Sequence, residues 1–110
     1  MEKNKNEAIN FFKEKIIDFF VPIKILHIGS NQKLKNDDCN YESDFDIIII
    51  VEDEIDCYEY SKQISSILKE TIVKFDILIS AYPIKESIYL NGISEFLNNV
   101  RINSTEIWKI

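Results

Sequence analysis

The length, composition and charge of the chain limit what it can be. Its 110 residues, 45% hydrophobic and 29% charged, fit one globular domain spanning residues 1–110 and are too few for two separate cores. Acidic side chains outnumber basic ones by 19 to 13, a net charge of −6. We therefore expect no direct binding to nucleic acid, because that affinity comes mainly from cationic side chains.

Two further features bear on the location of the protein. No stretch without a charged residue exceeds eight positions, whereas a membrane-spanning helix needs roughly 20 apolar residues. The charged start MEKNKNE is not followed by the apolar segment of a signal peptide. Cys39 and Cys57 form neither a CxxC pair nor a zinc-ligand set. We expect a cytoplasmic protein with reduced thiols and no membrane contact.

The first half of the chain predicts a helix and two strands. Apolar residues at helical spacing predict a helix from Asn6 to about Phe20. The buried stripe of this helix would consist of Ile9, Phe12, Ile16 and Phe19. The β-branched run Ile23–Ile28 is typical of a strand, and the polar residues 31–43 separate it from the next one. That next run, Phe45–Val51 (FDIIIIV), is the strongest strand pattern in the sequence.

The second half predicts further alternation of helices and strands. A helix over Asp56–Glu70, capped by Asp56, leads into a third strand over Ile72–Ser80 (IVKFDILIS). Shorter elements complete the chain: a helical turn over Ile84–Leu90, a helix from Gly92 to about Asn99, and a terminal edge strand over Thr105–Ile110. The expected fold class is α/β in the broad sense (α+β), a mixed β-sheet flanked by helices.

Three aspartates stand in apolar strand patterns, where carboxylates are rare. Asp44 and Asp46 are two positions apart at the start of the most apolar strand, so their side chains would share one face. Asp76 lies within the run KFDILI. Since an unpaired buried carboxylate is costly, a divalent cation is one explanation, and Mg²⁺ prefers such oxygen ligands. The other is that Asp44 and Asp46 lie at an exposed strand end while Asp76 pairs with Lys74.

A strand that ends in Gly29-Ser30 precedes this pair of aspartates. Glycine allows close approach of the backbone to a ligand, and a helix beginning after Ser30 would direct free N–H groups at an anion. A lone Gly-Ser is a weak signal. A strand ending in Gly-Ser, then Asp-x-Asp opening an apolar strand, then an aspartate in a later apolar run is much more specific.

This pattern resembles the DNA polymerase β-like nucleotidyltransferase superfamily, in particular its minimal nucleotidyltransferases (MNT). The matching segments are HIGS (27–30), SDFDIIII (43–50) and KFDILIS (74–80), with a tail, SEFLNNVRINSTEIWK (94–109), like the end of these small proteins. The sequence departs from the family after Gly-Ser. Asn31-Gln32-Lys33-Leu34-Lys35 replaces the usual small and basic residues, and the spacer before Asp44 is thirteen residues long.

The resemblance implies a nucleotidyltransferase (polymerase β palm-like) fold and roles for five residues. Gly29 and Ser30 would bind the β- and γ-phosphates of ATP or another nucleoside triphosphate. Asp44 and Asp46 would ligate Mg²⁺, and Asp76 would complete a second metal site and help to deprotonate the attacking hydroxyl. The reaction would be attack of that hydroxyl on the α-phosphate with release of pyrophosphate.

The resemblance also implies a partner. Minimal nucleotidyltransferases often accompany a small helical HEPN-type protein, acting as the antitoxin of a toxin–antitoxin pair by transferring AMP to a tyrosine of the toxic ribonuclease. The alternative is a catalytically weak or inactive module of the same fold that neutralises or scaffolds its partner by contact, which the atypical loop favours. A third reading is transfer to a small molecule or an RNA end. The terminal strand could also pair with a second copy of the chain, giving a homo-oligomer.

Overall fold

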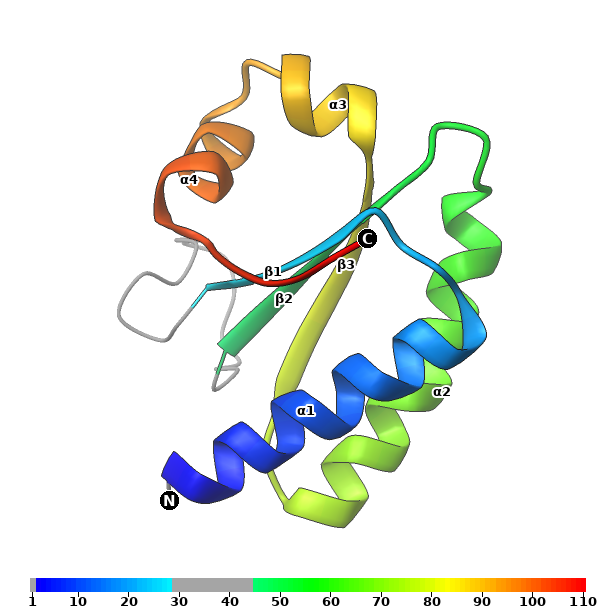
Figure 1. The fold of residues 1–110 in the computed structure, drawn as a ribbon, viewed down its shortest axis with the longest axis vertical. Coiled ribbons are helices and arrows are strands. Elements are labelled where there is room, and N and C mark those ends of the chain that lie inside the picture. The colour runs from blue at the N-terminus through cyan, green and yellow to red at the C-terminus, as the bar shows by residue number, and fades with distance from the viewer. Residues whose placement is uncertain (1, 29–44) are drawn as a thin grey trace.

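Two strands from the middle of the chain form the centre of a four-stranded sheet. The computed structural model describes residues 2–28 and 45–110, and within them the strand order is β3-β2-β1-β4 (Figure 1). The helices are α1 (Glu2–Phe19), α2 (Cys57–Phe75), α3 (Glu86–Asn91) and α4 (Glu95–Asn103). The strands are β1 (Lys24–Ile28), β2 (Phe45–Val51), β3 (Ile79–Lys85) and β4 (Thr105–Lys109).

The sheet is mixed, as expected from the sequence. Strand β1 runs antiparallel to both β2 and β4, whereas β2 runs parallel to β3. Parallel neighbours need a crossover connection, and helix α2 provides it between β2 and β3. The terminal strand β4 lies at one edge, as the sequence predicts, and β3 lies at the other.

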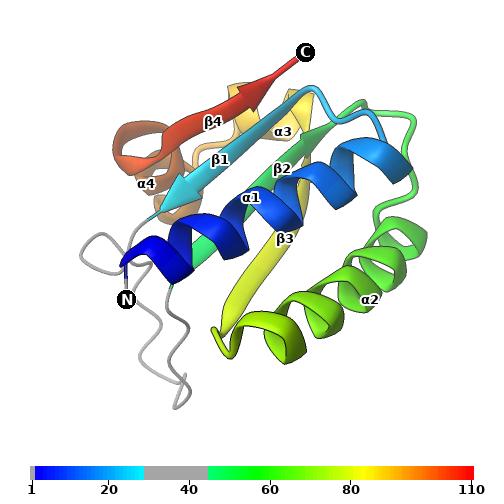
Figure 2. The ribbon, with the colours of Figure 1, turned by 60° about the horizontal axis from the view of Figure 1, so that its bottom comes forward.

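Helices cover both faces of the sheet, so the central strands are buried on both sides. Helices α1 and α2 lie against one face, and α3 and α4 lie against the other (Figure 2). Residues 47–51 of β2 are almost completely buried, alternating between the two cores. The result is an α+β fold with helices packed on a four-stranded mixed sheet. No helix in residues 2–28 or 45–110 has the length and hydropathy to cross a membrane.

The layer of α1 and α2 confirms most of the buried stripe predicted for the first helix. Phe12 and Ile16 of α1 are buried against the sheet, but Phe19, predicted to continue this stripe, is 67% exposed. Phe20, one position later, packs against Tyr60 of α2 with 4.1 Å between ring centroids. Asp56 caps α2 as predicted, because its carboxylate accepts hydrogen bonds from the N–H groups of residues 58 and 59.

The prediction of a third strand over Ile72–Ser80 is wrong for all but its last two residues. Helix α2 continues to Phe75, and the strand β3 begins only at Ile79. Contacts with α1 stabilise the last turn of α2: Phe75 meets Phe11 edge-on at 5.5 Å, and the Lys74 ammonium lies 4.6 Å from the centre of the Phe11 ring. These contacts outweigh the weak strand propensity of the Ile-Val pair in that turn.

Helices α3 and α4 are held together by one arginine. Arg101 donates hydrogen bonds to the carbonyl oxygens of Tyr89, at 2.6 Å, and Gly92, at 2.7 Å. Gly92 also allows close contact between the helices, because a Cβ there would overlap the Leu97 side chain and lie 2.6 Å from the Ile88 carbonyl oxygen. This clamp fixes how the two short helices lie on the sheet.

We expect Arg101→Ala to lower the free energy of unfolding by about 1.5–3 kcal/mol, because it removes two charge-assisted hydrogen bonds. Urea denaturation measures the effect. Lys109→Ala, which removes an exposed cation from the last strand, should change the free energy of unfolding by less than about 0.5 kcal/mol. Equal effects of the two changes would show that the hydrogen bonds of Arg101 do not stabilise the fold.

Candidate functional site

The candidate site lies at one end of the sheet, where β1 stops and β2 and β3 start. The last residue of β1, Ile28, pairs with Asp46 near the start of β2, and Phe45 pairs with Ile79 at the start of β3. The end of β1 and the starts of β2 and β3 therefore lie together at this end of the sheet, which Figure 2 also shows. Helix α2 ends three residues before β3, and residues 29–44 connect β1 to β2.

Asp46 carries a buried carboxylate at this end of the sheet. Only 5% of its surface is exposed, directly before the run of fully buried residues in β2. Residues paired across a sheet project to the same face, so Asp46 shares its face with Ile28 of β1 and with the half-buried Ser80 of β3. This is the face covered by α3 and α4. The sequence alternative in which Asp46 occupies an exposed strand end is wrong for this residue.

His27 is the titratable neighbour of Asp46. It precedes Ile28, so its side chain projects to the opposite face, and it is half-buried. Burial lowers the pKa of the imidazole below its ordinary value of 6.5, and the negative charge of Asp46 partly opposes this shift. A half-buried histidine with a lowered pKa is typical of an imidazole packed at the end of a strand.

Asp76 does not lie on a strand. It is the C-cap of α2, in the left-handed region with φ 54°, and its N–H donates to the Ile72 carbonyl oxygen at 2.8 Å. Aspartate tolerates this conformation better than most residues, and the position explains an aspartate in an otherwise apolar run. Its side chain is exposed, and the pairing with Lys74 that one of the two explanations requires is not formed, because the Lys74 ammonium lies over the Phe11 ring instead.

The other predicted site residues fall outside the described part of the chain. Gly29 and Ser30 follow β1 directly, and Asp44 directly precedes β2, but all three belong to residues 29–44. Among the described residues, no three His, Cys, Asp or Glu side chains gather closely enough to hold a metal ion. The expected set of Asp44, Asp46 and Asp76 includes one residue beyond that search. Of the five predicted site residues, the structure therefore describes Asp46 and Asp76 alone.

Sequence reasoning missed two polar residues that the fold places in special environments. Ser80 faces Asp46 across the parallel pair, and only the register reveals this, because no sequence pattern marks the serine. The Tyr60 hydroxyl is buried without a hydrogen-bond partner among the described residues, and burial raises the pKa of this phenol. Tyr60 belongs to the layer of α1 and α2, so it lies apart from the face of Asp46.

The comparisons with known proteins give no family for this chain. No protein-family model, no curated protein and no solved structure matches it.

We predict that the single histidine titrates below pH 6.5 in the folded protein and that Asp46→Asn lowers its pKa further, because the change removes a stabilising negative charge. The imidazole resonances in an NMR titration report this directly. Asp53→Asn, at an exposed position in the turn after β2, serves as the matched control and should leave the pKa of His27 unchanged. A higher pKa in Asp46→Asn would contradict the assigned coupling.

The same shift predicts a dependence of stability on pH. The imidazole of His27 binds its proton less tightly in the folded protein than in the unfolded chain. Its contribution to the free energy of unfolding is therefore fully present above about pH 6.5 and is lost as the pH falls through the folded-state pKa. Urea midpoints measured across this range should fall more steeply for the wild type than for His27→Gln. Parallel curves would show that another group controls the acid limb.

Proposed function

We propose that the chain is an Mg²⁺-dependent nucleotidyltransferase with a polymerase β palm-like fold. It would transfer a nucleoside monophosphate, AMP from ATP in the simplest case, to a hydroxyl group on a partner protein. The observation that carries the proposal is the buried carboxylate of Asp46. It lies at the end of the sheet where, in the sequence, Gly29-Ser30 follow β1.

The topology supports this reading. Ile28 pairs with Asp46 across the sheet. In the sequence, Gly-Ser follows Ile28 directly, and Asp46 is the last residue of Asp-x-Asp. A carboxylate almost removed from water at such a point is disfavoured unless positive charge or hydrogen bonds compensate it. A divalent cation, with oxygen ligands from the protein and from substrate phosphates, is one such compensation.

The proposed reaction assigns a task to each residue. Gly29 and Ser30 would hold the β- and γ-phosphates through backbone N–H groups and the hydroxyl. Asp44 and Asp46 would hold Mg²⁺, which supplies charge stabilisation to the phosphoryl oxygens when bound. The acceptor oxygen forms a bond to the α-phosphorus, the bond from that phosphorus to the pyrophosphate oxygen breaks, and Asp76 would take the proton of the acceptor hydroxyl.

The acceptor that we propose is a tyrosine of a small helical HEPN-type ribonuclease, with this chain as the antitoxin of the pair. This part of the proposal rests on the resemblance of the motifs to minimal nucleotidyltransferases. The net charge of −6 favours a protein acceptor over a nucleic acid, because phosphates would be repelled by the acidic surface.

A non-catalytic module that neutralises its partner by contact is the second candidate. The position of Asp76 favours it, because an exposed carboxylate on a helix cap is explained by the local backbone alone. In this reading Asp46 would be a structural carboxylate, and nucleotide would have no site.

The prediction that tests the first candidate uses ATP and Mg²⁺. The wild type should bind ATP in calorimetry only when Mg²⁺ is present, and it should transfer the label of [α-³²P]ATP to the folded product of the adjacent gene. Asp46→Asn should weaken Mg²⁺-dependent binding by about 10–100-fold or more, since even outer partners of a metal site have effects of that size.

Asp18→Asn is the matched control for this experiment, because it removes an exposed carboxylate from α1, on the opposite face of the sheet from Asp46. It should bind ATP and transfer label like the wild type. If the wild type binds no ATP with Mg²⁺, the transferase proposal fails. Neutralisation of the partner that survives in Asp46→Asn would select the contact module.

A further inference from the structure

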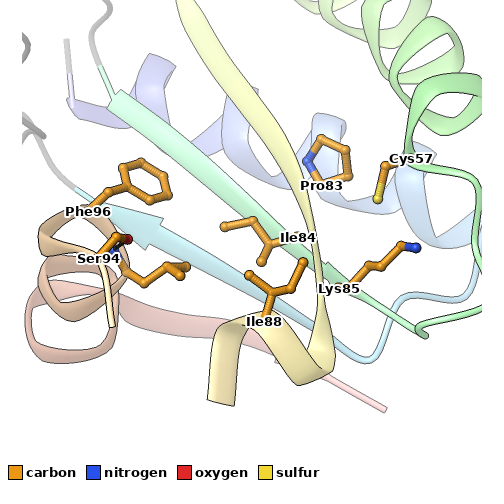
Figure 3. A pocket seen from close by; sticks show the side chains of 8 residues that line it. Cys57, Pro83, Ile84, Lys85, Ile88, Ser94 and Phe96 are labelled. Carbon is orange, nitrogen blue, oxygen red and sulfur yellow. Dashed lines mark hydrogen bonds between the residues drawn. The ribbon is translucent and has the colours of Figure 1, made fainter. Parts of the chain in front are cut away.

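A largely apolar groove runs beside the edge strand β3. It has a volume of about 410 Å³ and lies between the second half of β3 and helices α3 and α4. Ile84, Ile88 and Phe96 direct apolar side chains into it, and Pro83, Lys85 and Cys57 mark its outer end (Figure 3). The clamp by Arg101 fixes the two helices that form its wall.

The walls of the groove leave large apolar side chains in contact with water. Ile88 is 48% exposed and Phe96 is 39% exposed, although both line the groove. Leu90 and Ile93, in α3 and in the connection to α4, are more exposed still. Large apolar side chains that line a groove and stay exposed to water are typical of an interaction site.

The rim of the groove is strongly acidic. The segment from Glu52 to Glu59 carries five exposed carboxylates and no basic residue, and it contains Cys57, which lines the groove. Glu86 and Glu95 are exposed and adjoin groove residues in the sequence, and Lys85 is the only cation among the lining residues that the structure describes. Asp53 also accepts a hydrogen bond from the Ser87 N–H, which joins the acidic turn to the start of α3.

We propose that this groove binds a basic amphipathic helix of a partner protein. Apolar side chains of the helix would occupy the groove, and Lys or Arg side chains on its flanks would face the acidic rim. A strand added to the edge of β3 is the less suitable occupant, because Pro83 has no N–H group to donate to an added strand. A second copy of this chain is disfavoured by its charge of −6.

The surface and the proposed transferase activity are independent, and their tests use different measurements. The probe for the groove is a synthetic peptide with Leu and Lys at helical spacing, compared with a peptide in which Glu replaces every Lys. The readout is alkylation of Cys57 by N-ethylmaleimide in a Cys39→Ser background. The Leu/Lys peptide should slow alkylation in proportion to its binding, and the Leu/Glu peptide should not.

Groove variants separate docking from simple charge attraction. Phe96→Glu makes the protein more acidic but damages the groove, so it should weaken binding of the Leu/Lys peptide about tenfold or more. Val73→Glu adds the same charge at an 85% exposed position on α2, away from the groove residues, and should bind like the wild type. Circular dichroism of each variant establishes that the fold is retained.

Three outcomes would overturn the proposal. Equal protection of Cys57 by both peptides would exclude charge complementarity, and undiminished binding to Phe96→Glu would exclude the groove. A dimer in sedimentation velocity that Phe96→Glu abolishes would show that a second copy occupies the groove.

Discussion

The burial of β2 on both faces is the constraint on which the structure depends. Residues 47–51 occupy the interior of the sheet, with β1 and β3 on either side and helices above and below. A strand that is apolar at every position cannot leave a face open to water, so the chain must supply two helical layers. Asp46 stands where this apolar run begins, and the same constraint removes its carboxylate from water. A buried carboxylate at this point therefore follows from the position of the residue in the strand and from the two covering layers.

The two layers differ in how completely they cover the sheet. Helices α1 and α2 are long, with 18 and 19 residues, and they also pack against each other through Phe11 and Phe75. Helices α3 and α4 have six and nine residues, and α3 contributes no buried side chain. Apolar residues that a longer helix would have buried stay in contact with solvent in this layer. The apolar groove beside β3 is a consequence of this thin cover.

The sequence predicted those parts of the fold in which local pattern and tertiary packing agree. Phe45–Val51 matches β2 in both bounds, because an apolar β-branched run has few other uses. Asp56 was identifiable as a cap from its position before the helical spacing began. The run around Asp76 has the pattern of a strand because Ile72 and Val73 favour a strand locally, while the contacts of Phe75 with α1 hold them in a helix. Packing between elements that are distant in the sequence cannot be predicted from a local stretch of about ten residues.

The candidate site was predictable to a smaller extent. The motifs identify which aspartates interrupt apolar runs, but not their faces, which depend on where each strand begins. Asp46 is buried on a strand, whereas Asp76 owes its exposure and its left-handed backbone to the end of α2. The neighbour of Asp46 across the sheet, Ser80, was out of reach because its position follows from the register of β2 and β3.

The geometry of β3 connects the two surfaces for which we propose functions. Ser80 and Ile84 are four residues apart on this strand, so they project to the same face, about 13 Å apart along it. Asp46 shares that face at the Ser80 end, and the groove begins at the Ile84 end. A helix seated in the groove would therefore lie on the side of the sheet toward which Asp46 projects. If the chain is a transferase, a partner bound there would present its acceptor hydroxyl from this side of the sheet.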